Sequence, residues 1–425
     1  MSDIRHSKPE LAGEMLAIGL DARNAAGGLR EIRPLDRTFA ILEIAKSLRN
    51  CAGQILEANG RDLQSAGNLT PALRDRLLLD DKRVEAMAKG VENVAALSDP
   101  VGRELARWQR PNGLDIQRIA TPIGVIGMVY ESRPNVTADA AALCLRSGNA
   151  VILRGGSEAA QTNAAIYEAI QAALILTKVP SQSVQLVQTT DREAVGLMLQ
   201  GLDGAVDLII PRGGKSLVAR VQAEARVPVL AHLEGICHVY VHAAAKPDMA
   251  RKIVLNAKMR RTGVCGAAET LLIDRSILST LGLSLLGDLK AAGCEIRGDD
   301  AVRAVFPSAK PATEDDWRTE YLDAIIAVKT VDGVEDAVRH IETYGSHHTE
   351  SIVTEDGLAA ERFLAALDSA IVLWNASTQF ADGGEFGMGA EIGIGTGKMH
   401  ARGPVGVEQL TTFKYVVRGT GQVRP

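Results

Sequence analysis

Apolar residues recur at helical spacing through the first hundred residues of the chain. The clearest run comprises Phe39, Ile41, Leu42, Ile44, Ala45, Leu48, Ile55 and Leu56. Spacings of three and four residues place such side chains on one face of a helix. Asp36 precedes this run at a position suited to cap the first helical turn. The pattern therefore predicts a helical N-terminal quarter.

From about residue 121, short apolar runs alternate with helical stretches. The runs that predict strands lie at 124–130, 149–154, 184–188 and 207–211. A helix is predicted at 136–147, another from about 158, and others after the last two runs. Short apolar strands separated by helices are typical of a parallel sheet with helices on both faces.

The same alternation returns in the second half. An apolar run at 238–241 is followed by an amphipathic stretch at 246–261 and a run at 270–273, with further runs near 324–331 and 370–374. A second α/β domain is the simplest interpretation. After a Gly-rich tail, 411–417 again predicts a strand, which would be exposed unless it is paired.

Composition narrows the function classes. A chain of 425 residues with 46% hydrophobic and 23% charged residues fits two or three globular domains. The 47 basic and 52 acidic residues give a net charge of -5, which disfavours nucleic acid as a partner. No stretch approaches the roughly 18 apolar residues of a membrane span, and residues 1–16 lack a signal-peptide core. We expect a cytoplasmic protein that does not enter a membrane.

Two Gly-rich loops follow predicted strands of the first sheet. "RGGSE" occupies 154–158 and "PRGGK" occupies 211–215. Paired glycines allow close approach of a ligand, an adjacent arginine supplies charge, and helix N-termini beyond such strands attract phosphate. Tight strand-to-helix turns also use glycine, but two such loops in one sheet favour a nucleotide. No GxGxxG follows an early strand, so the standard Rossmann phosphate loop is not predicted.

Five cysteines are widely spaced and form no CxxC pair, which argues against a disulfide framework or a zinc site. Cys51 and Cys144 lie in apolar helical stretches and are interpreted as core, while Cys294 lies beside a predicted strand. Cys237 and His238 are neighbours on a predicted strand, so their side chains face opposite ways.

Cys265 is the fifth cysteine, in "TGVCGAAETLLID" at 262–274. Its small neighbours, Gly263, Gly266, Ala267 and Ala268, leave room for a substrate, and basic residues lie just upstream. Two interpretations stay open from these residues alone: a buried small side chain, or a nucleophile. The adjacent His347 and His348 lack a second ligand cluster at metal-binding spacing, so no metal is predicted.

Four long motifs match one family in order. They are "GVIGMVYESRPNVTADAAALCLRSGNAVILRGGSEAAQTNAA", "DLIIPRGG", "NAKMRRTGVCGAAETLLID" and "GGEFGMGAEIGIGTGKMHARGPVGVEQLTTFKYV". They resemble the γ-glutamyl phosphate reductases, also called glutamate-5-semialdehyde dehydrogenases, a branch of the aldehyde dehydrogenase superfamily. The resemblance covers nearly the whole chain, from "ILEANGRDL" onward.

The resemblance implies an aldehyde dehydrogenase-like α/β fold. Its parts would be a nucleotide-binding domain (1–108, 121–237 and 386–408), a catalytic domain (238–385) and a small β oligomerisation element (109–120 and 409–425). The last part would pair a hairpin with the C-terminal strand. The expected partners are further copies of this chain and a glutamate 5-kinase.

The resemblance also assigns site residues. Cys265 would be the nucleophile, and Asn135 would stabilise the oxyanion beside the backbone N–H of Cys265. The cofactor-binding residues would be Arg154, Gly155, Gly156, Ser157, Glu158, Arg212, Gly213, Gly214 and Glu320. The substrate-binding residues would be Asn256, Lys258, Arg260 and Arg261, with His347, His348 and Arg402 as further contacts. Glu234 receives no general-base role.

The implied reaction is the NADPH-dependent reduction of L-glutamyl 5-phosphate to L-glutamate 5-semialdehyde and phosphate through a Cys265 thioester, in proline biosynthesis. Arginine at 154, in place of the lysine of relatives, favours the 2′-phosphate of NADPH over NADH. Two alternatives share these motifs: an acylating aldehyde dehydrogenase that uses coenzyme A, and a catalytically silent nucleotide-binding homologue.

Overall fold

The computed structural model describes residues 8–67, 69 and 71–424. Residues 1–7, part of the stretch where no signal peptide is expected, lie outside the described residues. Contacts divide the chain into two compact units. The first unit runs to Ala231 and includes Met388–Gly393 and the chain from Val405; the second comprises His232–Gly387 and Ile394–Pro404. The chain thus passes into the second unit at residue 232, before the predicted boundary at 237.

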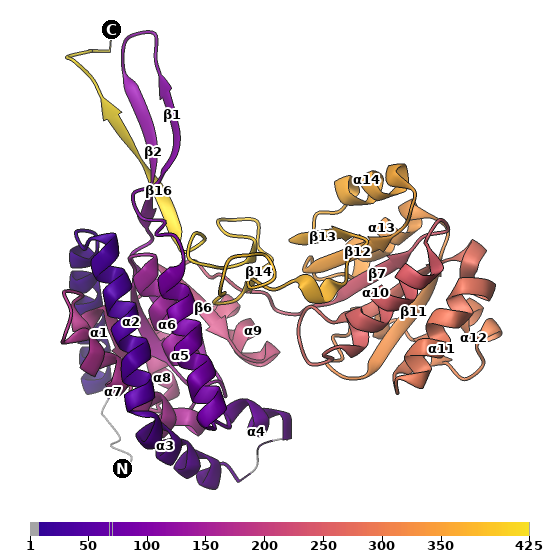
Figure 1. Cartoon of the computed structure of the whole chain (residues 1–425), viewed down its shortest axis with the longest axis horizontal. Coiled ribbons are helices and arrows are strands. Elements are labelled where there is room, and N and C mark those ends of the chain that lie inside the picture. Colours follow the sequence, from indigo (N-terminus) through magenta and orange to yellow (C-terminus); the bar gives the residue numbers. More distant parts are fainter. Residues whose placement is uncertain (1–7, 68, 70, 425) are drawn as a thin grey trace. The chain divides into compact units, whose positions relative to one another are not determined.

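The first unit is built on a parallel sheet with the strand order β5-β4-β3-β6. Figure 1 labels the edge strand β6. Its strands are β3 (Val125–Tyr130), β4 (Ala150–Arg154), β5 (Val184–Leu186) and β6 (Leu208–Arg212). Every residue of β3 and β4 is buried, as expected for central strands covered on both faces. These strands lie within two residues of the predicted runs.

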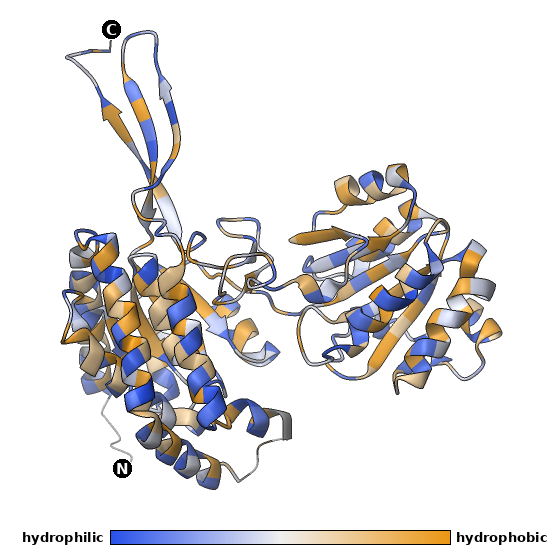
Figure 2. Ribbon diagram, in the orientation of Figure 1, coloured by the Kyte–Doolittle hydropathy of each residue, from blue (hydrophilic) through white to orange (hydrophobic). Residues whose placement is uncertain are grey.

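Helices surround this sheet, and Figure 2 shows their mixed apolar and polar faces. They are α1 (Lys8–Leu29), α2 (Pro34–Asn50), α3 (Ala52–Ser65), α4 (Pro71–Leu77), α5 (Asp81–Ala96), α6 (Val136–Arg146), α7 (Ala160–Leu174), α8 (Arg192–Leu199) and α9 (Lys215–Glu224).

Two predictions in the helical quarter are wrong in detail. Asp36 does not cap α2: Arg33 is the N-cap, Pro34 begins the helix, and Asp36 lies in the first turn, 2.7 Å from the Arg33 guanidinium. Proline fits the first helical position because its missing N–H is not needed there. Cys51 is not core either, since it is half-buried between α2 and α3.

A separate antiparallel sheet in the first unit contains β1 (Glu104–Gln109), β2 (Asp115–Pro122) and β16 (Thr411–Arg418). The hairpin begins at Glu104 rather than near the predicted 109. β16 pairs with β2 along its length, from Thr411 opposite Pro122 to Arg418 opposite Asp115. The C-terminal strand therefore has the partner that its exposed position required.

The second unit contains a larger parallel sheet with the order β10-β9-β11-β8-β7-β12-β13. Its strands are β7 (Cys237–Val241), β8 (Ala268–Asp274), β9 (Glu295–Gly298), β10 (Lys310–Pro311), β11 (Ile325–Val331), β12 (Thr349–Val353) and β13 (Ile371–Trp374). A short hairpin pairs β14 (Ile394–Gly395) with β15 (Gly403–Pro404).

Helices cover both faces of the larger sheet. They are α10 (Pro247–Met259), α11 (Leu283–Ala291), α12 (Asp300–Val305), α13 (Val334–Tyr344) and α14 (Gly357–Ala366). One core cluster joins Leu271 of β8 to Val254 of α10 and Leu285 of α11. A second joins Tyr240 of β7 to Phe363 of α14. The two clusters make the sheet the middle of a three-layer unit.

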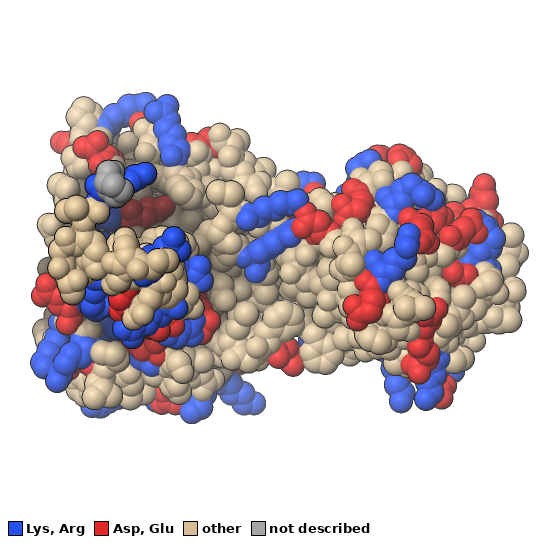
Figure 3. All heavy atoms as spheres, turned by 90° about the horizontal axis from the view of Figure 1, so that it is seen from above, with Lys and Arg blue, Asp and Glu red and all other residues tan. Residues whose placement is uncertain are grey.

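Charges of both signs are interspersed over the face drawn in Figure 3, with no large field of one sign. This distribution agrees with the small net charge of -5. Among the described residues, no helix is long and apolar enough to cross a membrane.

Candidate active site

Cys265 lies in the short loop between α10 and β8, and its side chain is half-buried. The loop sits at the amino ends of the strands, because β8 begins only three residues later. Its backbone is held from β7: the Cys237 thiol donates to the Cys265 carbonyl at 3.1 Å. Burial raises the pKa of the Cys237 thiol well above its usual range, so Cys237 keeps its proton and acts as a donor. The predicted separation of Cys237 from His238 is confirmed, since His238 instead contacts Glu350.

The small residues around Cys265 pack tightly rather than leaving room, which corrects the sequence interpretation. Gly266, Ala267 and Ala268 are buried, and a Cβ on Gly266 would lie 3.0 Å from the Thr378 carbonyl oxygen. Only Gly263 faces comparatively open space, with its nearest neighbour 3.9 Å away. A residue outside the motif is more tightly constrained: a Cβ on Gly235 would lie 2.1 Å from the Cys265 carbonyl oxygen.

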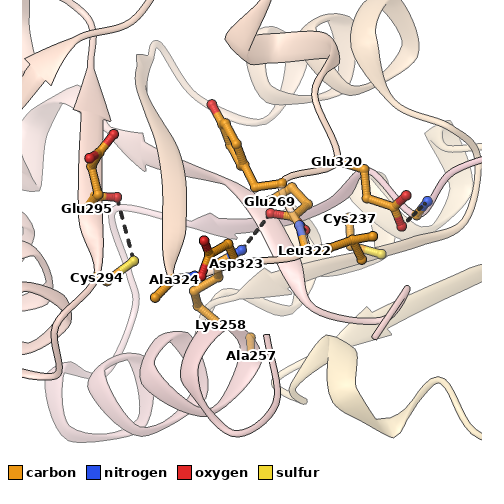
Figure 4. A network of polar contacts seen from close by, with 12 residues as sticks. Cys237, Ala257, Lys258, Glu269, Cys294, Glu295, Glu320, Leu322, Asp323 and Ala324 are labelled. Atoms are coloured by element: carbon orange, nitrogen blue, oxygen red, sulfur yellow. Dashed lines mark hydrogen bonds and ion pairs between the residues drawn. The ribbon is translucent and has the colours of Figure 1, made fainter. Parts of the chain in front are cut away.

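Lys258 of α10 and Glu269 of β8, the two elements on either side of this loop, form a buried ion pair (Figure 4). Both side chains are 0% exposed, and Lys258 Nζ lies 2.5 Å from Glu269 Oε2. The other carboxylate oxygen of Glu269 accepts the N–H of Leu322 at 3.2 Å. Burial raises the pKa of Glu269 to about 7, although Lys258 acts in the opposite direction. The prediction that Lys258 contacts the substrate directly does not fit this placement, because its ammonium is committed to Glu269.

The pair supports the loop that carries Glu320. Glu269 holds the backbone of Leu322, and Glu320 Oε1 accepts the N–H of Gly235 at 2.9 Å. Gly235 in turn lies against the Cys265 carbonyl. The Glu320 carboxylate is therefore positioned within the second unit, on the same local network as Cys265.

Gln379 is a positioning residue that the sequence did not indicate. Its amide Nε2 donates to the carbonyls of Ala257 at 3.0 Å and Arg261 at 3.1 Å, at the end of α10. The side chain is 8% exposed. These two bonds fix the segment that leads into the nucleophile loop. Gln379 lies over a hundred positions from Cys265 in the sequence, so its contact with this segment becomes visible only in the folded structure.

The remaining predicted substrate contacts differ in exposure. Asn256, Arg260 and Arg261 are exposed on the final turn of α10 and just after it, near the nucleophile loop. Arg402 is paired with Asp368, at 2.6 Å. His347 adopts a left-handed backbone with φ of 57°, and the next residue, His348, is fully buried.

In the first unit, the Gly155–Gly156 loop follows β4 as predicted. Arg154 is 8% exposed and its guanidinium donates to the carbonyls of Gly155 and Thr190. Glu158 accepts the Ser132 N–H at 2.6 Å and the Ser132 hydroxyl at 2.8 Å. Ser157 begins a 3₁₀ turn that leads into α7.

The Gly213–Gly214 loop follows Arg212, the last residue of β6. Glu131 reaches it from the end of β3, and its Oε2 accepts the Gly214 N–H at 3.0 Å. A Cβ on Gly213 would lie 2.4 Å from that oxygen. The N-terminus of α9 thus binds an internal carboxylate, which shows that this position attracts a negative group.

Asn135 is the N-cap of α6, in the loop after β3. Its amide donates to Asp139 Oδ2 at 2.8 Å, and burial raises the pKa of Asp139 to about 6. Asn135 and Cys265 belong to different units, so their joint action on an oxyanion stays a prediction.

Three loops meet at the carboxyl edge of the first sheet, because β4 and β6 both flank β3. An open parallel sheet binds nucleotides at this edge. The buried Nε of Arg154 has no hydrogen-bond partner among the described residues, and the α9 N-terminus attracts an anion. These features fit a phosphate-bearing nucleotide in the first unit.

Comparisons with known proteins identify the family of the chain. The profile of the aldehyde dehydrogenase family matches residues 21–294. A γ-glutamyl phosphate reductase of Brucella anthropi is 60% identical over 417 residues, covering 98% of both chains. One of a Caulobacter species (strain K31) is 62% identical over 417 residues, covering 98% of this chain and all of the relative.

A crystal structure of γ-glutamyl phosphate reductase from Thermotoga maritima is similar over the same extent. It is 45% identical, its TM-score is 0.95, and the match covers 97% of this chain and 100% of the other. The predicted fold class is thereby confirmed, and a nicotinamide cofactor follows from the family. The chain belongs to the aldehyde dehydrogenase family, in its γ-glutamyl phosphate reductase branch.

Proposed function

We propose that this chain reduces L-glutamyl 5-phosphate to L-glutamate 5-semialdehyde and phosphate, with NADPH as the reductant, in proline biosynthesis. The observation that carries the proposal is Cys265, held by its backbone at the amino end of β8 with its side chain half-buried and cations nearby. The relatives at about 60% identity bear the name of this activity.

In the proposed mechanism, the Cys265 thiolate attacks the C5 carbonyl carbon of the acyl phosphate. Phosphate leaves with the electrons of the C–O bond, and a thioester remains on Cys265. The Asn135 amide and the Cys265 backbone N–H stabilise the oxyanion. NADPH, when bound, supplies the hydride that reduces the thioester carbon. The Cys265 sulfur then departs as the aldehyde forms.

The substrate's α-carboxylate and phosphate require cationic or amide partners. Asn256, Arg260 and Arg261 are proposed for this role, since all three are exposed near the nucleophile loop. Lys258 is proposed instead as a positioning residue that acts through Glu269. Glu320, fixed by Gly235, is proposed to hold the nicotinamide ribose.

Positive charge at the loops proposed to bind the nucleotide supports a preference for NADPH. Arg192 and Arg220 lie close enough to Arg154 to help lower the pKa of its guanidinium, after burial, which is the largest cause. Three guanidinium groups near "RGGSE" favour a cofactor with an additional phosphate. Replacing Arg154 by Ala is expected to lower kcat/KM for NADP more than for NAD, and an equal loss for both cofactors would contradict this role.

The reverse reaction tests the activity. Purified protein is supplied with glutamate semialdehyde, phosphate and NADP, and NADPH formation is followed by absorbance. We expect a rate that requires phosphate. Cys265→Ala is expected to abolish the rate while NADPH binding persists, and the matched variant Cys294→Ala is expected to stay active. Full activity of Cys265→Ala would refute the mechanism.

The same assay separates the alternatives. An acylating aldehyde dehydrogenase would respond to coenzyme A rather than phosphate, and a silent homologue would bind the nucleotide without turnover. Either result would replace the proposed activity.

Further copies of the chain are proposed to associate through the β1-β2-β16 sheet. Large apolar side chains on this sheet are 39% to 57% exposed: Trp108, Phe413, Tyr415 and Val417. The rings of Trp108 and Tyr415 meet edge-on, with centroids 6.1 Å apart. Exposed aromatic side chains on a strand with an open edge are typical of an interface. Tyr415→Lys should reduce the mass measured by light scattering if the sheet joins copies. A glutamate 5-kinase partner remains an expectation from the resemblance, and a cytoplasmic location remains an expectation from the sequence pattern.

A further inference from the structure

Two histidines lie beside Cys265, and they come from separate parts of the sequence. His232 precedes β7 and His348 precedes β12, while Cys265 precedes β8. These three strands are neighbours in the order β8-β7-β12, so their amino ends bring the three side chains together. One ligand atom from each residue lies within 4.8 Å of the other two.

The imidazole of His232 is oriented for a ligand. Its Nδ1 lies 2.8 Å from the carbonyl oxygen of Ile394. A carbonyl only accepts hydrogen bonds, so Nδ1 carries the proton and the Nε2 of the neutral ring keeps a lone pair. A backbone carbonyl that orients a histidine in this way is a frequent feature of metal sites.

The imidazole of His348 is fully buried and only partly satisfied. Its Nδ1 lies 2.9 Å from the Thr349 hydroxyl and 3.5 Å from the Cys237 sulfur. Its Nε2 has no hydrogen-bond partner among the residues that the structure describes. The two imidazole rings meet edge-on, with centroids 4.9 Å apart. A buried nitrogen without a partner is costly, and a bound cation would relieve that cost.

We propose that His232, Cys265 and His348 form a binding site for a thiophilic divalent cation such as Zn²⁺, and that the bound cation blocks the enzyme. Zn²⁺ prefers thiolate and imidazole ligands, and three protein ligands leave a fourth position for water. Tetrahedral Zn²⁺ places its ligand atoms about 3.5 Å apart, so the present spacing has to close by roughly 1 Å. Rotation of the half-buried Cys265 and His232 side chains supplies that movement.

Coordination of the cation by Cys265 prevents its sulfur from acting as a nucleophile. The Cys265 thiol loses its proton to solvent and its sulfur gives a lone pair to the cation, so the pair is not available to attack a carbonyl. Inhibition is reversible, because a chelator restores the free thiol. The consequence for catalysis rests on the proposed role of Cys265, whereas the binding itself does not.

Local sequence patterns do not predict this site. His347 and His348 are adjacent, but only His348 belongs to the cluster. The other two ligands lie 116 and 83 positions earlier, from 348 − 232 and 348 − 265. The expectation of no metal followed from spacing along the chain, which does not register ligands brought together by parallel strands.

Cobalt binding tests the proposal without relying on activity. The full-length protein is reduced, stripped with EDTA and titrated with Co²⁺, whose bond to a thiolate produces a near-ultraviolet charge-transfer band. We expect one equivalent to bind, with displacement by Zn²⁺. Cys265→Ser should lose the band, and His348→Gln should weaken Co²⁺ binding at least tenfold. His242→Gln is the matched control, because His242 lies at the carboxyl end of β7 and contacts Thr354.

Each outcome has one meaning. A band that survives in Cys265→Ser, or a His242→Gln variant that loses affinity as much as His348→Gln, would overturn the site. Zn²⁺ should also inhibit the phosphate-dependent assay and slow alkylation of Cys265, with EDTA reversing both. An active Cys265→Ser variant would refute the proposed function and leave the cobalt result standing. An active wild-type protein without a cobalt band would refute only the metal site.

Discussion

Replacing Lys258 by Met distinguishes a positioning role from direct substrate binding. Methionine keeps a similar length but removes the charge, so among the described residues Glu269 keeps the Leu322 N–H as its hydrogen-bond partner. In the folded protein the pKa of Glu269 is about 7 with Lys258 present, because burial disfavours the carboxylate. Without the lysine this pKa rises further.

The difference in the free energy of unfolding between the wild-type protein and Lys258→Met depends on pH. When the pKa of a carboxyl group is higher in the folded protein than its value of about 4.3 in the unfolded chain, the free energy of unfolding falls as pH rises between these two pKa values. The fall is about 1.36 kcal/mol per pH unit. In the wild-type protein this loss ends near pH 7, whereas in Lys258→Met it continues. The two proteins should therefore differ little at pH 6, and the variant should be less stable by about 3 kcal/mol at pH 9.

Urea unfolding at pH 6, 7, 8 and 9 measures this difference, and amide exchange at Leu322 reports it locally. Lys252→Met, an exposed position on α10, should change the free energy of unfolding by no more than about 0.5 kcal/mol. The double variant Lys258→Met with Glu269→Met removes both charges and should lose the extra pH dependence. A difference that is constant across pH, or a raised KM with unchanged stability, would refute the positioning role and restore direct substrate binding.

Three further substitutions test the local packing. Gly235→Ala places a Cβ 2.1 Å from the Cys265 carbonyl oxygen, so we expect a loss of about 1–3 kcal/mol and a fall in kcat, measured by unfolding and turnover. Gln379→Leu leaves two carbonyls of the α10 terminus without their donor and should cost about 1–3 kcal/mol, with faster alkylation of Cys265 as the local readout. Arg37 is 1% exposed and its guanidinium is the ion-pair partner of Asp99, so Arg37→Met leaves Asp99 without this partner. The substitution should cost about 3–5 kcal/mol of stability in the first unit, while NADPH binding per folded molecule stays unchanged.

The parallel sheets were predictable because their central strands are continuous apolar runs. β3, β4 and β8 fall within two residues of the expected ranges. A strand that is buried on both faces is a continuous apolar run, which can be recognised without an alternating pattern. β12 was missed because its first three residues, Thr349, Glu350 and Ser351, are polar. They are nevertheless buried: Glu350 contacts His238, and the Ser351 hydroxyl donates to the Ala376 carbonyl. Such a strand is stabilised by partners distant in sequence, which a local pattern does not contain.

In the candidate site, too, local sequence motifs predict which residues matter, but not the contacts these residues make with parts of the chain distant in sequence. The motif around Cys265 predicts a nucleophile, a role that stays a proposal, and its glycine and alanines predict open space. The structure instead buries all three, with Gly266 against the Thr378 carbonyl oxygen of η6 (Thr378–Phe380). Small residues serve close packing and ligand access equally well, and the sequence does not distinguish them. Charge is similarly ambiguous. Lys258 and Arg260 are two positions apart on one helix, yet one is fully buried in an ion pair and the other is exposed.

Internal carboxylates already occupy the backbone donors at the two Gly-rich loops proposed to bind the nucleotide. Glu131 and Glu158 already accept the backbone N–H groups of Gly214 and Ser132, which are donors of the kind that phosphate groups use. A phosphate that takes either donor must displace a carboxylate, so part of its binding energy offsets the lost hydrogen bond. The displaced carboxylate also repels the incoming anion unless it turns away. The proposed role of the arginines near "RGGSE" therefore extends beyond specificity, because positive charge at these loops would favour the exchange.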